Sequence, residues 1–141
     1  MQEAPLPTFR VDTGVSDPKT GYYPYMRLRV FPTVEAPGQA RRELSTLASR
    51  VDQRTLSDVT TVISELVGMS VANGARKPIE VSLQLDDRGL EGVVDDDGTG
   101  VRAISREEST LVLRILEGLV EEWGANNAGK RIWFRMNMRS A

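Results

Sequence analysis

The stretch IEVSLQLDDRGLEGVVD, residues 79–95, decides the fold class. Ile79–Leu85 and Leu90–Asp95 are rich in strand-forming apolar residues, and the four residues DDRG between them are typical of a tight turn. A turn this short joins two neighbouring strands that run in opposite directions. The stretch therefore predicts an antiparallel hairpin, and the rest of the chain has to pack around it.

An apolar stripe at helical spacing precedes the hairpin. It begins after Thr55 or Ser57, either of which can cap a helix, and it stops at Asn73-Gly74, a natural left-handed helix end. The stripe is formed by Val59, Val62, Ile63, Leu66, Val67 and Val71. We therefore expect a long helix that packs one face against the sheet.

The chain before this helix divides into three parts. Residues 1–26 hold four of the seven prolines and no periodicity, which predicts an N-terminal extension ahead of a domain at 27–141. Alternation from Arg27 to Val30 predicts a half-buried strand that Pro32 ends or confines to an edge. An amphipathic helix is expected at about 37–51. Its apolar side carries Ala40, Leu44, Leu47, Ala48 and Val51, and its polar side carries Arg41, Arg42, Glu43 and Arg50.

Beyond the hairpin, an acidic and glycine-rich cluster at 95–100 leads to a third helix. Ser109 is its expected cap and Trp123-Gly124 its expected end. Its expected buried residues are Leu111, Val112, Ile115, Leu116, Leu119 and Val120. Residues 131–138 alternate as a last strand, which gives the order β-α-α-β-β-α-β. The fold class is therefore α/β (α+β): a two-layer sandwich with a mixed, mostly antiparallel sheet and helices on one face.

Composition excludes several classes of function. The 141 residues include no Cys and no His, so thiolate nucleophiles, imidazole bases, disulfides and Cys- or His-based metal sites are all excluded. With 18 Lys and Arg against 20 Asp and Glu, the net charge of −2 argues against direct nucleic-acid binding. No apolar run is long enough for a membrane span. We expect a cytoplasmic protein without a nucleic-acid or membrane partner.

Four blocks, in order, resemble the GHKL (Bergerat-fold) ATPase domain, and most closely its anti-sigma-factor serine kinases. They lie within residues 27–138. The blocks are Glu65–Gly74, Asp96–Gly100, Thr110–Leu113, and Trp123-Gly124 with Gly129–Phe134. The resemblance implies a histidine kinase-like ATPase domain of the Bergerat fold.

The resemblance also assigns roles in a nucleotide site. Glu65 stands where the family has a general base, and Met69 replaces the Asn that ligates Mg²⁺ one turn later. A thioether is a poor Mg²⁺ ligand, so the resemblance predicts no protein metal ligand at that position. Asn73 is a helix C-cap or a relocated ligand.

The remaining site positions concern adenine and phosphate. Asp96 stands where a carboxylate accepts the adenine amino group, with Gly98 and Gly100 allowing close approach; the alternative is a solvated acidic turn. Thr110 and Val112 replace the glycines that would let backbone N–H groups hold phosphates. The implied cofactor is ATP or ADP with Mg²⁺, if the site is functional.

Three hypotheses of function follow. The first is a regulatory protein of the bacterial partner-switching type, a pseudokinase with vestigial Glu65 that binds a sigma factor or its antagonist. The alternative is an active ATP- and Mg²⁺-dependent serine kinase that phosphorylates an anti-anti-sigma factor. A third is an accessory domain that dimerises with an intact kinase. The resemblance implies a homodimer or heterocomplex through the sheet edge and the first helix, where Arg41, Arg42 and Arg50 steer an acidic partner or form a solvated face.

Overall fold

The computed structural model describes residues 25–85, 89–96, 106–126 and 131–137. Its five strands form one sheet in the order β1-β2-β3-β5-β4, and the described neighbours all pair antiparallel. The strands are β1 (Tyr25–Val30), β2 (Ile79–Leu85), β3 (Gly89–Asp95), β4 (Glu122–Asn126) and β5 (Arg131–Asn137). The predicted hairpin pairing of β2 with β3 is confirmed, whereas the expected mixed sheet is purely antiparallel over the described strands.

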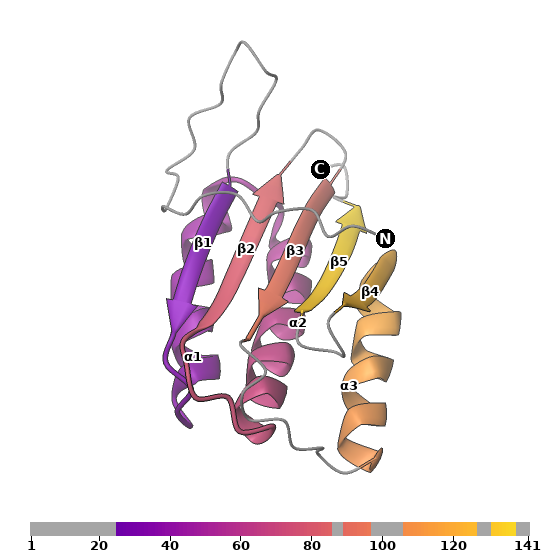
Figure 1. Ribbon diagram of the computed structural model, residues 1–141. Coiled ribbons are helices and arrows are strands. Elements are labelled where there is room, and N and C mark those ends of the chain that lie inside the picture. The colour runs from indigo at the N-terminus through magenta and orange to yellow at the C-terminus, as the bar shows by residue number, and fades with distance from the viewer. Residues whose placement is uncertain (1–24, 86–88, 97–105, 127–130, 138–141) are drawn as a thin grey trace.

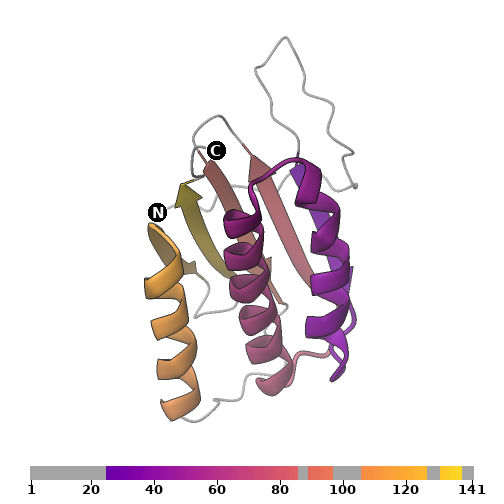
Figure 2. The same ribbon diagram turned by 180° about the vertical axis from the view of Figure 1, so that it is seen from behind.

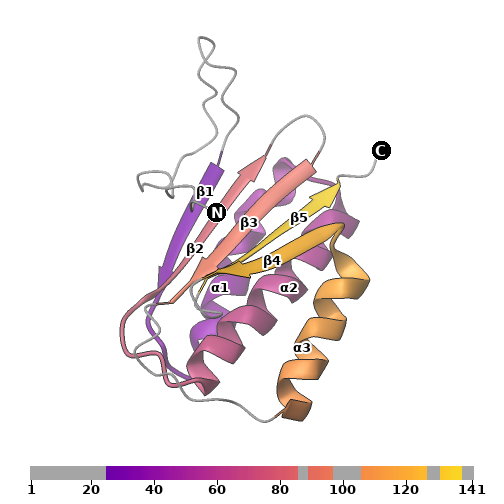
Figure 3. The ribbon, with the colours of Figure 1, turned by 45° about the vertical axis from the view of Figure 1, so that its right-hand side comes forward.

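Three α-helices cover one face of this sheet, which makes two layers as expected (Figures 1 and 2). They are α1 (Ala36–Leu44), α2 (Gln53–Ala72) and α3 (Arg106–Leu119), and a 3₁₀ helix, η1 (Ser45–Ser49), follows α1. Helix α2 lies between α1 and α3 behind the middle of the sheet (Figure 3). The mixed α/β class is therefore confirmed. No helix in the described ranges is long and apolar enough to cross a membrane.

Alternate strand residues meet the helices to form the core. Phe134 of β5 is fully buried and lies opposite Gly92 of β3 in the strand register. A Cβ atom at Gly92 would lie 2.3 Å from Phe134 Cζ, which is closer than real Cβ contacts allow. The glycine therefore makes the space that the phenyl ring fills.

The long helix α2 starts earlier than the sequence indicated. Asp52 is its N-cap and accepts a hydrogen bond from the Thr55 N–H at 3.1 Å, so the predictions of Thr55 or Ser57 as the cap were wrong. Thr55 is instead buried inside the first turn. The predicted end is confirmed, because Asn73 is the C-cap and Gly74 has a φ of 84°, which favours glycine. Five of the six predicted stripe residues are fully buried, and Val71 is half-buried.

The helix expected at 37–51 is shorter in the structure. Helix α1 ends at Leu44 and continues as the 3₁₀ helix. The Ser45 and Thr46 hydroxyls donate to carbonyl oxygens three residues earlier, which competes with α-helical bonding. Tighter winding leaves Leu47 buried but turns Ala48 to solvent, so the prediction of a buried Ala48 was wrong.

The strand β4 was missed by the sequence pattern. We expected Trp123-Gly124 to end the third helix, but α3 ends at Leu119 and both residues pair with β5. A Cβ at Gly124 would lie 2.6 Å from Trp133 Nε1, so this glycine accommodates the neighbouring indole. The helix also begins at Arg106, three residues before the expected cap Ser109.

Burial on α3 follows the prediction only in part. Val112 and Leu116 are buried, and Ile115, Leu119 and Val120 are half-buried. Leu111 is 59% exposed, so its predicted burial was wrong. Residues 111 and 112 lie about 100° apart around a helix, so only one of the two can face the core directly.

The first strand begins at Tyr25, two residues before the domain boundary expected from the sequence. Tyr25 and Met26 pair with Gln84 and Leu83 of β2. The rest of the predicted extension, residues 1–24, lies outside the described residues.

Candidate functional site

The first candidate residues lie on α2. A spacing of four residues brings Glu65, Met69 and Asn73 onto one side of the helix. The C-terminal end of α2, the end of β3 and the start of α3 all lie at the lower end of the molecule in Figure 1. The fold thus brings the α2, β3 and α3 candidates toward the same end of the domain.

Glu65 is half-buried on α2. Its carboxylate has no hydrogen-bond or ion-pair partner within the described part of the chain. A carboxylate held by a long helix and left without a partner is chemically able to accept a proton or to polarise a hydroxyl. The structure therefore leaves this residue available for the role expected of it.

Met69 is partly buried and packs against the hydrophobic core. Its thioether is soft, whereas Mg²⁺ requires oxygen ligands at short distance. No group of three acidic side chains that could hold a metal ion occurs in the described ranges. At this position the residues do not fit a protein-ligated Mg²⁺.

Asn73 ends α2. Its N–H donates to the Met69 carbonyl oxygen at 2.9 Å, and the Gly74 N–H donates to the Val71 carbonyl oxygen at 2.9 Å. This backbone geometry accounts for Asn73 as a C-cap. The alternative of a relocated metal ligand stays a prediction.

The acidic cluster at residues 95–100 begins at Asp95, the last residue of β3. Asp95 belongs to the strand and accepts hydrogen bonds from Arg131 Nε at 3.1 Å and from Arg131 Nη2 at 3.0 Å. Burial raises the pKa of Asp95 above its ordinary value, because the lowering by Arg131 does not offset the loss of solvent and the repulsion from Asp96 and Glu80. The sequence pattern did not indicate this ion pair. Its partners lie 36 residues apart.

Asp96 follows directly after β3 and is half-buried. The adenine role expected of it stays a prediction. Its expected companions Gly98 and Gly100 lie outside the described residues.

The phosphate-binding candidates lie inside α3 and not at its start. Because the helix begins at Arg106, the N–H groups of Thr110 and Val112 come after the first turn, where helical N–H groups bond to carbonyls four residues earlier. The side chain of Val112 is 7% exposed and belongs to the hydrophobic core. Neither N–H group is therefore positioned to hold a phosphate.

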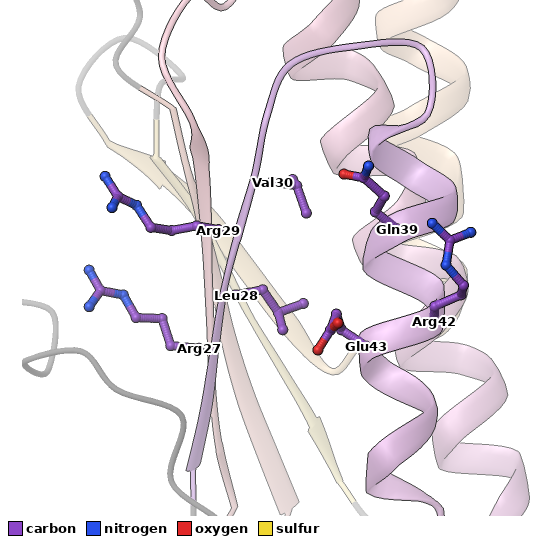
Figure 4. A pocket seen from close by; sticks show the side chains of 7 residues that line it. All are labelled: Arg27, Leu28, Arg29, Val30, Gln39, Arg42 and Glu43. Carbon is purple, nitrogen blue, oxygen red and sulfur yellow. The ribbon is translucent and has the colours of Figure 1, made fainter.

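A groove of about 400 Å³ lies elsewhere, between β1 and α1 (Figure 4). Leu28 and Val30 point from β1 toward α1, and Arg27 and Arg29 point to the other side of the strand. Gln39, Arg42 and Glu43 of α1 line the opposite wall. The sequence pattern indicated an edge strand and a charged helix face here, but not the groove that their packing creates.

Comparison with known proteins gives no assignment. Neither a scan against models of protein families nor a search of curated proteins finds a match to this chain.

Proposed function

We propose that the protein is an anti-sigma-factor-like regulatory protein of the bacterial partner-switching type. It acts by binding a sigma factor or its antagonist, and its binding of ATP and Mg²⁺ is impaired. The observation that carries the proposal is that Val112 is buried in the core and Met69 packs against it, at the positions where the resemblance calls for a phosphate-loop glycine and a metal ligand.

The physical argument concerns two separate parts of nucleotide chemistry. A thioether that packs against apolar side chains does not replace an amide oxygen as a ligand of a hard cation. A valine inside a formed helix fills space in the core, and its N–H is used by the helix. Both changes weaken the handling of metal and phosphate, and neither disturbs the fold.

A second candidate function is supported by Glu65. Its half-buried, unpartnered carboxylate is the group that an active ATP- and Mg²⁺-dependent serine kinase would need. In that function the substrate would be an anti-anti-sigma factor. Under either function we expect the protein to act in the cytoplasm.

Titration with a fluorescent ATP analogue, with and without Mg²⁺, separates the two functions. We expect binding no tighter than the high micromolar range, with no dependence on Mg²⁺ and no phosphate transferred to a candidate antagonist. Micromolar, Mg²⁺-dependent binding that Asp96→Ala abolishes, together with phosphate transfer to the antagonist, would instead support the kinase. Glu117→Ala, an exposed carboxylate on α3, is the matched control.

A further inference from the structure

The edge of β1 concentrates positive charge in an acidic protein. Residues 25–43 contain four arginines and two glutamates, a net charge of +2 in a chain whose formal net charge is −2. Arg41 and Arg42 are exposed and have no ion-pair partner in the described structure. Their guanidinium groups both lie within 4 Å of the position that a Cβ of Gly38 would occupy.

On the other side of β1, one carboxylate forms ion pairs with two arginines. Glu80 of β2 pairs with Arg27, and it also pairs with Arg29 at 3.0 Å. The Arg29 side chain remains 66% exposed despite this contact. Counting Glu80 with Glu35 and Glu43, three carboxylates stand against the four arginines around β1, which leaves one positive charge in excess near this strand.

The same strand is the edge of the sheet. Among the described strands β1 pairs with β2 alone, and an edge strand presents backbone N–H and C=O groups to which another strand can add. Just beyond its end, Phe31 and Val34 are 67% and 86% exposed. A partner strand that covered this end of β1 would remove these two apolar side chains from water.

We propose that β1 and the groove beside α1 receive an extended acidic segment of a partner protein, which adds to the sheet as a sixth strand. Side chains of an added strand alternate between the two faces. Acidic residues on one face would meet Arg29 and those on the other would meet Arg42, while an apolar residue at one end would cover Phe31 and Val34. We identify the partner only by its chemistry. The proposal rests on the proposed regulatory function in one respect, namely that the protein acts by binding another protein.

Three short peptides test this mode of binding. The first repeats Glu-Glu-Val-Val over eight residues, which places glutamates on both faces of a strand. The second has lysine for glutamate, and the third keeps the sequence of the first but has every peptide N–H methylated, so that neither of its edges can donate to β1. We expect the first to bind with the largest amide shifts in β1 and with slowed amide exchange there. The other two should bind at least about tenfold more weakly, since one has the charge reversed and the other lacks the backbone hydrogen bonds.

Variants locate the site on the protein. Arg42→Glu should weaken the first peptide about tenfold, and Arg29→Gln, which avoids a carboxylate beside Glu80, should weaken it about fivefold. Arg54→Glu, an exposed change at the start of α2, is the matched control and should alter affinity less than about twofold. Thermal unfolding of each variant shows that the fold is retained.

Several results would overturn the inference. They are equal binding of the glutamate and lysine peptides, shifts outside β1 and α1, and no saturable binding at peptide concentrations on the order of 1 mM. Self-association that Glu122→Lys abolishes would also overturn it, because β1 would then be covered by the acidic β4 edge of a second copy. ATP binding at micromolar concentration would refute the proposed regulatory function and leave the peptide result standing.

Discussion

Replacing Val112 by glycine tests whether α3 can be opened for phosphate binding. The side chain is 7% exposed, so the change removes almost the whole burial energy of a valine, about 1.5–3 kcal/mol. Glycine inside a helix costs about 1 kcal/mol more. We expect the free energy of unfolding, measured by urea titration, to fall by about 2.5–4 kcal/mol, and nucleotide affinity not to rise.

The neighbouring residue supplies the control. Leu111 is 59% exposed, so Leu111→Gly pays the same helix cost but loses little burial, and should reduce stability by about 1–1.5 kcal/mol. The two variants should therefore differ by about 2 kcal/mol, or about 1 M in the urea midpoint. Equal losses would refute the reasoning, because Val112 would then contribute nothing to the core and its position would be free for a nucleotide loop.

Three further predictions concern stability. Gly92→Ala should lower the free energy of unfolding by about 1–3 kcal/mol, because the added Cβ meets the buried Phe134 ring. Gly124→Ala should lower it less, because the added Cβ meets the half-buried Trp133 indole, which is able to move outward. Burial raises the pKa of the Asp95 carboxyl, so the folded chain holds the carboxyl proton more tightly than the unfolded chain does. The free energy of unfolding should therefore decline as pH rises from 3.8 through the raised pKa. Asp95→Asn should remove this decline when the urea midpoint is measured as a function of pH. Hydrogen bonds from Thr55 hold the pKa of Asp52 below 3.8, so this carboxylate stabilises the fold above that pH and the effect is lost as pH falls through the lowered pKa. Asp52→Ala should lower Tm near neutral pH and leave it almost unchanged in strong acid; an equal loss at both would contradict the assignment.

Local sequence patterns predicted most of the elements. The hairpin, the end of α2 at Asn73 and Gly74, and the alternation of β5 each follow from residues that are neighbours in the chain. Among the features that the sequence pattern missed, strand β4 and the Asp95–Arg131 ion pair depend on contacts between distant residues, whereas the start of α2 and the 3₁₀ turn after α1 depend on local hydrogen bonds. Strand β4 exists because Trp123 and Gly124 pair with β5, and five residues with a glycine at the centre do not themselves indicate a strand.

The candidate site was less predictable than the fold for the same reason. Motif matching places residues on elements, but it does not decide which way a side chain points when an element starts earlier than expected. The start of α3 at Arg106 places Val112 beyond the first turn of the helix, and its burial in the core is the one that the apolar pattern predicted. The groove beside β1 has no local pattern at all, since its two walls lie on separate elements.

The positions that differ from the nucleotide-binding pattern share a physical property. Met69 and Val112 both contribute apolar surface to the core, whereas the asparagine and glycine in the pattern would contribute a polar amide or no side chain. Partly burying an unpaired amide costs free energy, and so does leaving a gap in a packed core. A chain that no longer uses metal and phosphate therefore gains stability from these residues. A chain that kept the asparagine and the glycine in order to bind ATP would need other stabilising contacts to offset these two free-energy costs. This asymmetry favours the regulatory function over the kinase, and restoring the polar residues should reduce stability even where it restores binding.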